Sequence, residues 1–193
     1  MTTVLLTGFE PFGTATSNPS GEIVKQISGD NIVTAILPVA YVGSAGRLLA
    51  LITEHNPDVV ICLGQAEGRT QITPEKIAIN LDDARLADNE GVLRNDVKIL
   101  ENGPDAYFTT LPVNKMVEAI KAKGVPAAVS LSAGAFLCNH VFYVAQSKLA
   151  GTKVRSGFVH VPLMDSQAPE FPGLPTMPLD QMVKAVRAML EVL

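Results

Sequence analysis

The sequence predicts an α/β fold, a three-layer α/β/α sandwich around a largely parallel central sheet. Segments with strand patterns alternate along the chain with segments of helical apolar spacing, as in parallel sheets whose strands are connected by helices. The run VVICL, within residues 58–63, is apolar throughout and is closed by Gly64, which is typical of a strand buried on both faces. The 193 residues suit a single domain, expected to span 1–193, that can bury a sizeable core.

The first half of the chain begins with an apolar run that ends in a loop rich in glycine and proline, GFEPFGTATSNPSG. Ser20 or one of its neighbours can cap the helix that follows this loop. Leucine and isoleucine then recur at helical spacing before residue 55. We expect strands at 4–9, 32–38 and 58–63, and helices at 21–27 and 44–55.

The second half continues the alternation after one long irregular segment. Residues 76–82 alternate between apolar and polar, as in a strand, whereas 83–105 are polar with scattered Asn, Asp and Gly and should form a loop or flap. We expect further strands at 127–131 and 157–161, and helices at 113–123, 136–149 and 179–193.

Composition and charge argue against several classes of function. The net charge is −4 and no run of Lys or Arg occurs, so a nucleic-acid surface is not expected. No apolar run is long enough to span a membrane, and the start of the chain resembles a first strand rather than a signal peptide. The two cysteines form no disulfide framework, which favours a cytoplasmic location.

Cys138 stands where the turn SAGA gives way to the helix expected at 136–149. A thiol in the first turn of a helix lies among unpaired backbone N–H groups at the positive end of the helix dipole. Its pKa can fall there from ~8.5 to roughly 3.5–7.5, and the same N–H groups can hold an oxyanion. Cys138 is therefore a candidate nucleophile, although a thiol packed beneath the helix is equally compatible with its position. Cys62, inside an apolar strand, is expected to be core.

A nucleophilic cysteine needs a base, and the sequence contains three histidines. His140 follows Cys138 by two residues, about 200° around the helix, so its ring should point away and hydrogen-bond elsewhere. His55 lies in a helix-to-strand turn and is expected to be solvated or to cap the helix. His160 lies near the carboxyl end of the expected strand at 157–161, at the same sheet edge as Cys138. His160 is therefore the preferred base. Its alternative role is that of a core residue whose ring is bonded to the backbone.

The segment ITPEKIAINLD offers a carboxylate that could orient this histidine. Strand periodicity places Glu75, Ile77, Ile79 and Leu81 on one face, which we expect to be the core face. Glu75 would then point inward, where a carboxylate needs a partner such as a histidine N–H. A frayed strand end with Glu75 in water is the alternative.

Seven blocks along the chain resemble, in order and spacing, the pyroglutamyl-peptidase I (pyrrolidone-carboxylate peptidase) family of cysteine peptidases. The resemblance extends over roughly residues 4–162. The blocks are TGFEPFG, SNPS, GQAEGRTQITPEKIAIN, ARLADNEG, TLPV, SAGAFLCNHVFY and GFVHVP.

This resemblance implies a Cys-His-Glu triad that removes an N-terminal pyroglutamyl residue from peptides through a thioester. The matching positions are Cys138, His160 and Glu75. It also implies an α/β/α fold, a peptide substrate with N-terminal pyroglutamate, a cytosolic setting and a homotetramer. No metal and no cofactor are expected.

A pyroglutamyl residue is a flat, neutral lactam, so its site should offer apolar walls and a few backbone hydrogen bonds. The aromatic residues that hold the lactam ring in the family match Phe9 and Phe12. From the residues alone, one of these two side chains could equally be packed in the core and the other exposed. The resemblance further places the backbone of Gln65 and the Phe136-Leu137 pair around the lactam.

Two polar residues have expected roles on the same basis. Arg85 matches a family arginine near the developing oxyanion, whereas the residues alone favour a surface ion pair with Asp82 or Asp88. Asn18 of SNPS is expected to tie the aromatic loop in place or to act as a turn residue.

Overall fold

The computed structural model describes residues 2–193 and contains a central five-stranded sheet in the order β2-β1-β3-β7-β4. Strands β1, β2, β3 and β7 run parallel, and the short β4 pairs antiparallel with β7 at one edge. The strands are β1 (Val4–Phe9), β2 (Ile32–Leu37), β3 (Val59–Gln65), β4 (Thr73–Pro74) and β7 (Arg155–Val161). The predicted largely parallel sheet is confirmed.

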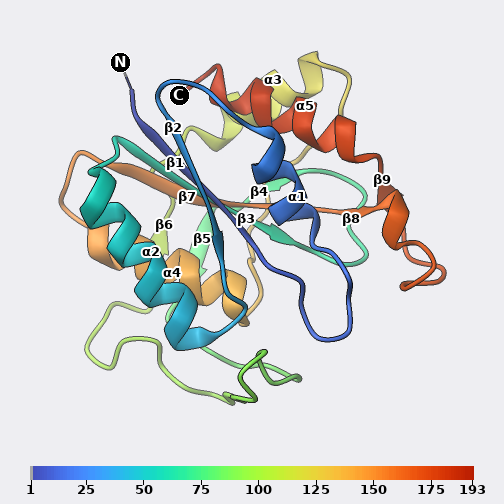
Figure 1. Ribbon diagram of the computed structural model, residues 1–193. Coiled ribbons are helices and arrows are strands. Elements are labelled where there is room, and N and C mark those ends of the chain that lie inside the picture. Colours follow the sequence, from blue (N-terminus) through green and yellow to red (C-terminus); the bar gives the residue numbers. More distant parts are fainter. Residues whose placement is uncertain (1) are drawn as a thin grey trace.

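Helices cover both faces of this sheet, which gives the three predicted layers (Figure 1). One face carries α1 (Pro19–Gln26), α3 (Val113–Ala122) and α5 (Leu179–Leu190), and the other carries α2 (Tyr41–His55) and α4 (Leu137–Leu149). Each face has its own apolar core, because alternate residues of a strand point to opposite sides. None of the helices within residues 2–193 is both long and apolar enough to cross a bilayer.

The predicted strand at 127–131 is wrong as a regular strand. The segment runs parallel to residues 72–76 but forms only the isolated bridges Ile72↔Ala127 and Glu75↔Ser130. The backbone N–H groups of Ile72 and Lys76 donate across this gap, whereas Pro74 between them has no N–H to give. The proline therefore interrupts the ladder in its middle.

The predicted strand at 76–82 is shorter than expected and its burial has the opposite phase. Only β5 (Ile77–Ile79) forms, paired with the unpredicted β6 (Ala106–Phe108). Ala78 and Asn80 are buried, while Ile77 and Ile79 are half-buried. The chain changes partner after Glu75, whose N–H still donates to β7 at Phe158, so one strand phase does not run through the whole segment.

The remaining connections frame the carboxyl edge of the sheet. The long loop expected at 83–105 forms beside α2 and α4 and begins earlier, at residue 80 (Figure 1). The N–H of Asp83 donates to the carbonyl of Ala135, and the N–H of Tyr41 donates to the Asp88 carboxylate, which holds the loop in place. The segment after β7 contains β8 (Leu163–Met164), the 3-10 turn η1 (Asp165–Gln167) and β9 (Thr176–Met177), which lead into α5.

Candidate active site

Cys138 occupies the first turn of α4, as predicted. The helix begins at Leu137, its N-cap is Phe136, and no side chain caps its first turn. The thiol is half-buried and free of any disulfide. The backbone N–H groups of this turn therefore have no side-chain cap among residues 2–193.

The sulfur of Cys138 lies directly against β3. A Cβ added to Gly64 would come within 2.8 Å of Sγ, so only a glycine leaves room for the thiol. Gly64 pairs in register with His160 of the neighbouring strand β7. Paired residues of parallel strands point to the same face, and Phe158, which shares that face with His160, belongs to the core beneath α4. His160 and Cys138 thus occupy the same side of the sheet.

His160 is buried and bonded to the predicted carboxylate. Its Nδ1 lies 2.7 Å from Oε1 of Glu75, which has no exposed surface. With Nδ1–H donated to this carboxylate, Nε2 is the nitrogen left to exchange a proton. The prediction that the side chain of Glu75 points inward is confirmed. The strand phase on which that prediction was based is wrong, because Ala78 and Asn80 are the buried residues of 77–80.

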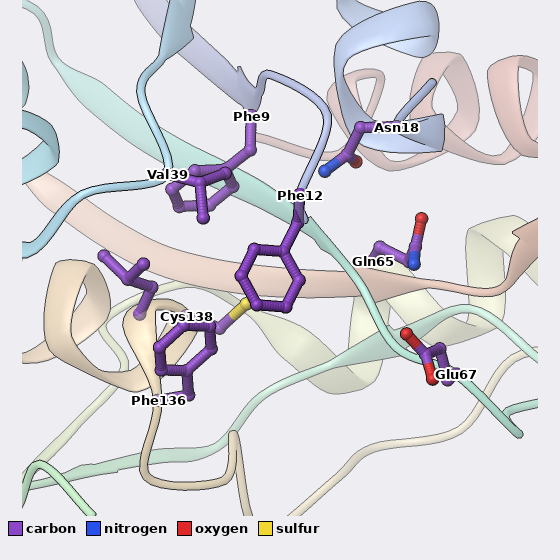
Figure 2. Close-up of a pocket in the computed structure, with 9 residues that line it drawn as sticks. Phe9, Phe12, Asn18, Val39, Gln65, Glu67, Phe136 and Cys138 are labelled. Atoms are coloured by element: carbon purple, nitrogen blue, oxygen red, sulfur yellow. The ribbon is translucent and has the colours of Figure 1, made fainter. Parts of the chain in front are cut away.

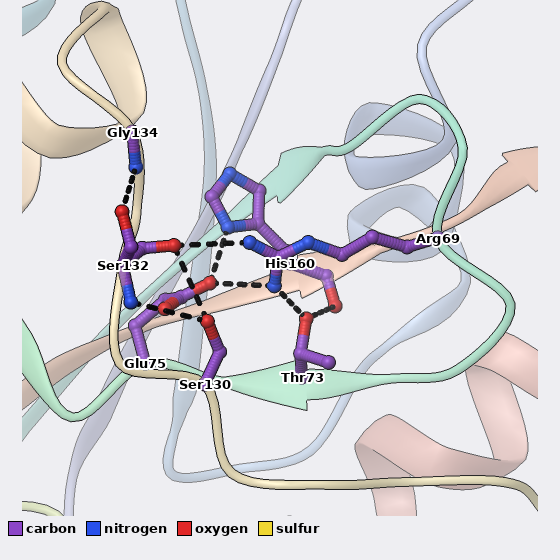
Figure 3. A network of polar contacts seen from close by, with 7 residues as sticks. All are labelled: Arg69, Thr73, Glu75, Ser130, Ser132, Gly134 and His160. Carbon is purple, nitrogen blue, oxygen red and sulfur yellow. Dashed lines mark hydrogen bonds and ion pairs between the residues drawn. The ribbon is translucent and has the colours of Figure 1, made fainter.

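Arg69 neutralises this buried carboxylate, as Figure 3 shows. Its guanidinium lies 2.7 Å from Glu75 Oε1, also donates to Thr73, and reaches the carbonyl of Ser132 at 3.0 Å. Ser132 belongs to the turn that leads into α4. Arg69 therefore ties the segment that carries Glu75 to the turn that precedes the helix of Cys138.

The electrostatics of this group favour neutral sulfur and neutral imidazole. Burial, with a contribution from the Glu75 carboxylate, raises the pKa of Cys138 to about 12, and the charge of Arg69 offsets only part of this. Burial lowers the pKa of His160 below 6.5, in spite of its bond to Glu75. The expected lowering of the thiol pKa by the helix terminus is therefore outweighed by desolvation. Burial likewise raises the pKa of Cys62 to about 12, consistent with its predicted place in the core.

A pocket of about 160 Å³ opens beside Cys138 (Figure 2). Phe9, Phe12, Phe136 and Leu137 supply most of its apolar wall. All five of the predicted substrate-binding residues line it, together with Cys138 and three further side chains. The complete lining is Phe9, Phe12, Asn18, Val39, Gln65, Glu67, Phe136, Leu137 and Cys138.

The aromatic loop after β1 is fixed on both sides. The ring of Phe12 packs on Phe136 with 5.4 Å between centroids. Asn18 caps α1 by accepting from Ser20 and donates its amide N–H to the carbonyl of Glu10 in the loop. The expected role of Asn18 as a tie for this loop matches these contacts.

The other predicted polar residues lie outside the pocket. Arg85 is exposed and does not line this pocket. Asp82, one of the two ion-pair partners that the residues alone suggested for Arg85, is bound by other groups. Its Oδ2 lies 2.7 Å from the guanidinium of Arg94 and 2.9 Å from Nδ1 of His140. His140 therefore points away from Cys138 as expected. His55 ends α2, while Asn56 in the left-handed conformation is its C-cap.

Sequence reasoning missed Arg69, Glu67 and Val39. An arginine six positions before a buried glutamate was the available signal for Arg69, but the turn between them hid the direction of its side chain. Val39 and Glu67 follow strand ends, where side-chain direction depends on loop geometry. Within residues 2–193 no three or more His, Cys, Asp or Glu side chains gather as metal ligands would.

Comparison with known proteins agrees with this geometry. The family model described as pyroglutamyl peptidase matches residues 2–193. Pyrrolidone-carboxylate peptidase of Bacillus thuringiensis (strain Al Hakam) is 44% identical, covering 100% of this chain and 93% of its own. The protein of the same name from Cupriavidus pinatubonensis is 46% identical, with 97% and 90% covered.

Solved structures give the same result. The crystal structure of Bacillus amyloliquefaciens pyroglutamyl peptidase I has a TM-score of 0.94 and 43% identity, covering 98% of this chain and 95% of that one. A mutant pyrrolidone carboxyl peptidase from Pyrococcus furiosus has a TM-score of 0.91 and 37% identity, with 98% and 97% covered. This chain therefore belongs to the pyroglutamyl peptidase family of cysteine peptidases.

Proposed function

We propose that this protein removes an N-terminal pyroglutamyl residue from peptides, with Cys138 as nucleophile, His160 as base and Glu75 as the group that orients the base. The observation that carries the proposal is a cysteine in the wall of a small apolar pocket, beside Gly64 and on the sheet face of a histidine–carboxylate pair. Membership in the family, and the names of the relatives, support the same substrate.

The pocket suits a neutral lactam better than a charged N-terminus. Phe9, Phe12 and Phe136 offer flat apolar surface to the ring, and Gln65 lies at the carboxyl end of β3, where its backbone can bond the ring amide. A free α-ammonium group would be desolvated against these rings at high cost, and the charge of Glu67, which is exposed, is screened by solvent.

Attack begins from the neutral pair. Because the pKa of the thiol is raised and that of His160 lowered, Nε2 of His160 takes the S–H proton as sulfur bonds to the pyroglutamyl carbonyl carbon. Glu75 stabilises the imidazolium that results. The uncapped N–H groups at the start of α4 hold the oxyanion. Arg85 is the proposed second donor to the oxyanion, and its side chain would have to turn inward from its exposed position.

Collapse of the tetrahedral intermediate breaks the C–N bond. The imidazolium of His160 returns its proton to the leaving amine, which leaves a thioester on Cys138. His160 then takes a proton from water as the oxygen attacks the thioester, and it protonates the departing sulfur. The products are free pyroglutamate, the shortened peptide and the unchanged enzyme.

A panel of chromogenic amides tests this function against a cysteine hydrolase of different specificity. The proposal expects rapid hydrolysis of the pyroglutamyl amide, slow or no hydrolysis of the prolyl and glutamyl amides, and loss of activity with iodoacetamide. Comparable rates on all three amides would instead indicate a general cysteine amidase.

A homotetrameric assembly and a cytoplasmic location are also proposed. The family resemblance supports the assembly, and the two unpaired cysteines fit a reducing compartment. Light scattering on the purified protein tests the assembly, because a monomer mass at micromolar concentration would contradict it.

A further inference from the structure

A second, larger hollow adjoins the pocket of Cys138. Its volume is about 630 Å³, against about 160 Å³ for the pocket itself. The two share Phe12, Gln65 and Glu67 as lining residues, so they are continuous on this side. Figure 2 shows Gln65 and Glu67 on one side of Phe12, with Val39 on the other. We call the larger hollow the outer cavity.

The walls of the outer cavity are held by hydrogen bonds between loops far apart in sequence. The hydroxyl and N–H of Thr16 donate to the Glu170 carboxylate at 2.7 and 3.2 Å, which joins the aromatic loop to the segment carrying Phe171. The N–H of Gly13 donates to Asn89 at 3.1 Å, and the Asn89 amide returns a bond to Pro11. The cavity is therefore a built surface rather than a gap between independent loops.

The charge of the outer cavity is negative. Glu67 is exposed, and within residues 2–193 its carboxylate has no hydrogen bond or ion pair. Asp88, 6% exposed, also lines the cavity; burial opposes its ionisation, but N–H donors from Tyr41, Val92 and Glu90 prevail and keep its pKa low. No Lys, Arg or His is among the side chains that line the cavity in the described chain.

Substrate chemistry fixes which part of the peptide reaches this cavity. A pyroglutamyl residue is closed on itself, so nothing extends from its amino side. The chain continues only from the carbonyl attacked by Cys138. With the lactam in the small pocket, the next residues need an open, partly polar space continuous with it, and the outer cavity meets this condition.

We propose that the outer cavity binds the residue that follows pyroglutamate, and that Glu67 makes it favour a positively charged side chain there over a negatively charged one. This inference rests on the proposed function. Because Glu67 is exposed, solvent screens its charge, and the expected preference is modest. Attraction of one sign and repulsion of the other should together give about a 10-fold ratio at low salt.

The experiment compares kcat/KM for peptides of sequence pyroglutamyl-Lys-Ala amide and pyroglutamyl-Glu-Ala amide, with the pyroglutamyl-norleucyl peptide as a neutral reference. The Lys:Glu ratio should be about 10 in the wild type at ~10 mM salt and should shrink at ~0.5 M salt. Glu67→Gln should bring the ratio to about 3 or below, and Glu67→Lys should reverse it. Glu118→Gln, an equal charge change on the exposed face of α3, should keep the wild-type ratio.

The outcomes separate this inference from the proposed function. A wild-type ratio near one, or a ratio that survives Glu67→Gln, would overturn the charge preference while pyroglutamyl hydrolysis still stands. Failure to release pyroglutamate from all three peptides would overturn the proposed function, and with it the inference. Since each ratio is measured within one variant, partial loss of folded protein cancels out.

Discussion

The sulfur of Cys138 rests against Gly64, so closely that a Cβ on Gly64 would lie 2.8 Å from Sγ. Gly64 is also the register partner of His160 on the adjacent strand. One glycine thus sets how near α4 can approach the sheet and where its thiol stands relative to the histidine. This contact makes the backbone of β3 part of the candidate active site.

Gly64→Ala should therefore impair activity more than stability. The added methyl group would meet the sulfur and the ring of Phe158, at 2.6 Å, and would push both aside. A displacement of the nucleophile of about 1 Å can cost roughly 10²-fold in kcat, while overpacking costs about 1–3 kcal/mol of the free energy of unfolding. Steady-state kinetics and urea unfolding measure the two effects. Gly46→Ala in α2 is the control, because an added Cβ there would have no atom within 4 Å. An equal loss of activity in both variants would refute the role of the Gly64–Cys138 contact in catalysis.

Glu75→Gln should lower kcat by roughly 10²- to 10⁴-fold with little change in KM, because a neutral amide neither fixes the same tautomer of His160 nor stabilises its imidazolium. Asp82→Asn is a matched control. Asp82 holds His140 and Arg94 as Glu75 holds His160 and Arg69. Only His160, however, is the register partner of Gly64, against which the sulfur of Cys138 lies. If the two variants lost equal activity, Glu75 would have no special role.

The pH dependence of kcat/KM should show an acid limb below pH 6.5. His160 must be neutral to accept a proton, and its pKa lies below that ordinary value, so activity falls only when pH drops through the lowered pKa. The positive charge of Arg69 contributes to this lowering. Arg69→Met should therefore raise the pKa of His160 and move the acid limb to higher pH.

Arg94→Met is the matched control for Arg69→Met. Arg94 makes a 2.7 Å ion pair with buried Asp82, and its side chain is 25% exposed, as is that of Arg69. Its removal should leave the acid limb in place, even if the protein becomes less stable. An acid limb that moves in both variants, or in neither, would contradict the link between Arg69 and His160.

Phe12→Ala should weaken substrate binding. Phe12 packs on Phe136 and lines both the pocket and the outer cavity, so its loss removes one wall against the lactam. Aromatic packing of this kind is worth about 0.5–1.5 kcal/mol, which corresponds to roughly a 2- to 12-fold rise in KM for a pyroglutamyl amide. Phe108→Ala, at a 67% exposed ring, should leave KM unchanged. A rise in KM for Phe108→Ala but not for Phe12→Ala would exclude Phe12 from the pocket wall.

Much of the fold could be predicted from residue patterns because its sheet is parallel and its helices are amphipathic. Continuous apolar runs such as that of β3 have one plausible placement, between two helical layers. The segment at 127–131 could not be placed in this way. Its pairing depends on Pro74, more than fifty positions away, and local patterns carry no information about a missing N–H in the partner strand.

The candidate site divides along the same line. The positions of Cys138 and His160 follow from strand and helix ends, which sequence locates well. Their protonation could not be predicted, because the helix terminus is a local feature whereas burial and the nearby Glu75 arise from tertiary packing. Glu75 shows most clearly what local patterns leave out. Its side chain is buried as expected, but its orientation is set where its backbone N–H bonds Phe158 of β7, and the alternation of the segment that follows does not predict it.

The most direct test of the account is the turnover of a pyroglutamyl amide by Cys138→Ala. Loss of the nucleophile should reduce kcat by roughly 10⁴-fold or more, while circular dichroism shows a folded protein. Cys62→Ala, at the buried cysteine of β3, should lose stability but keep its activity per folded molecule. A folded Cys138→Ala enzyme that retained kcat within about tenfold of the wild type would contradict nucleophilic catalysis by this thiol.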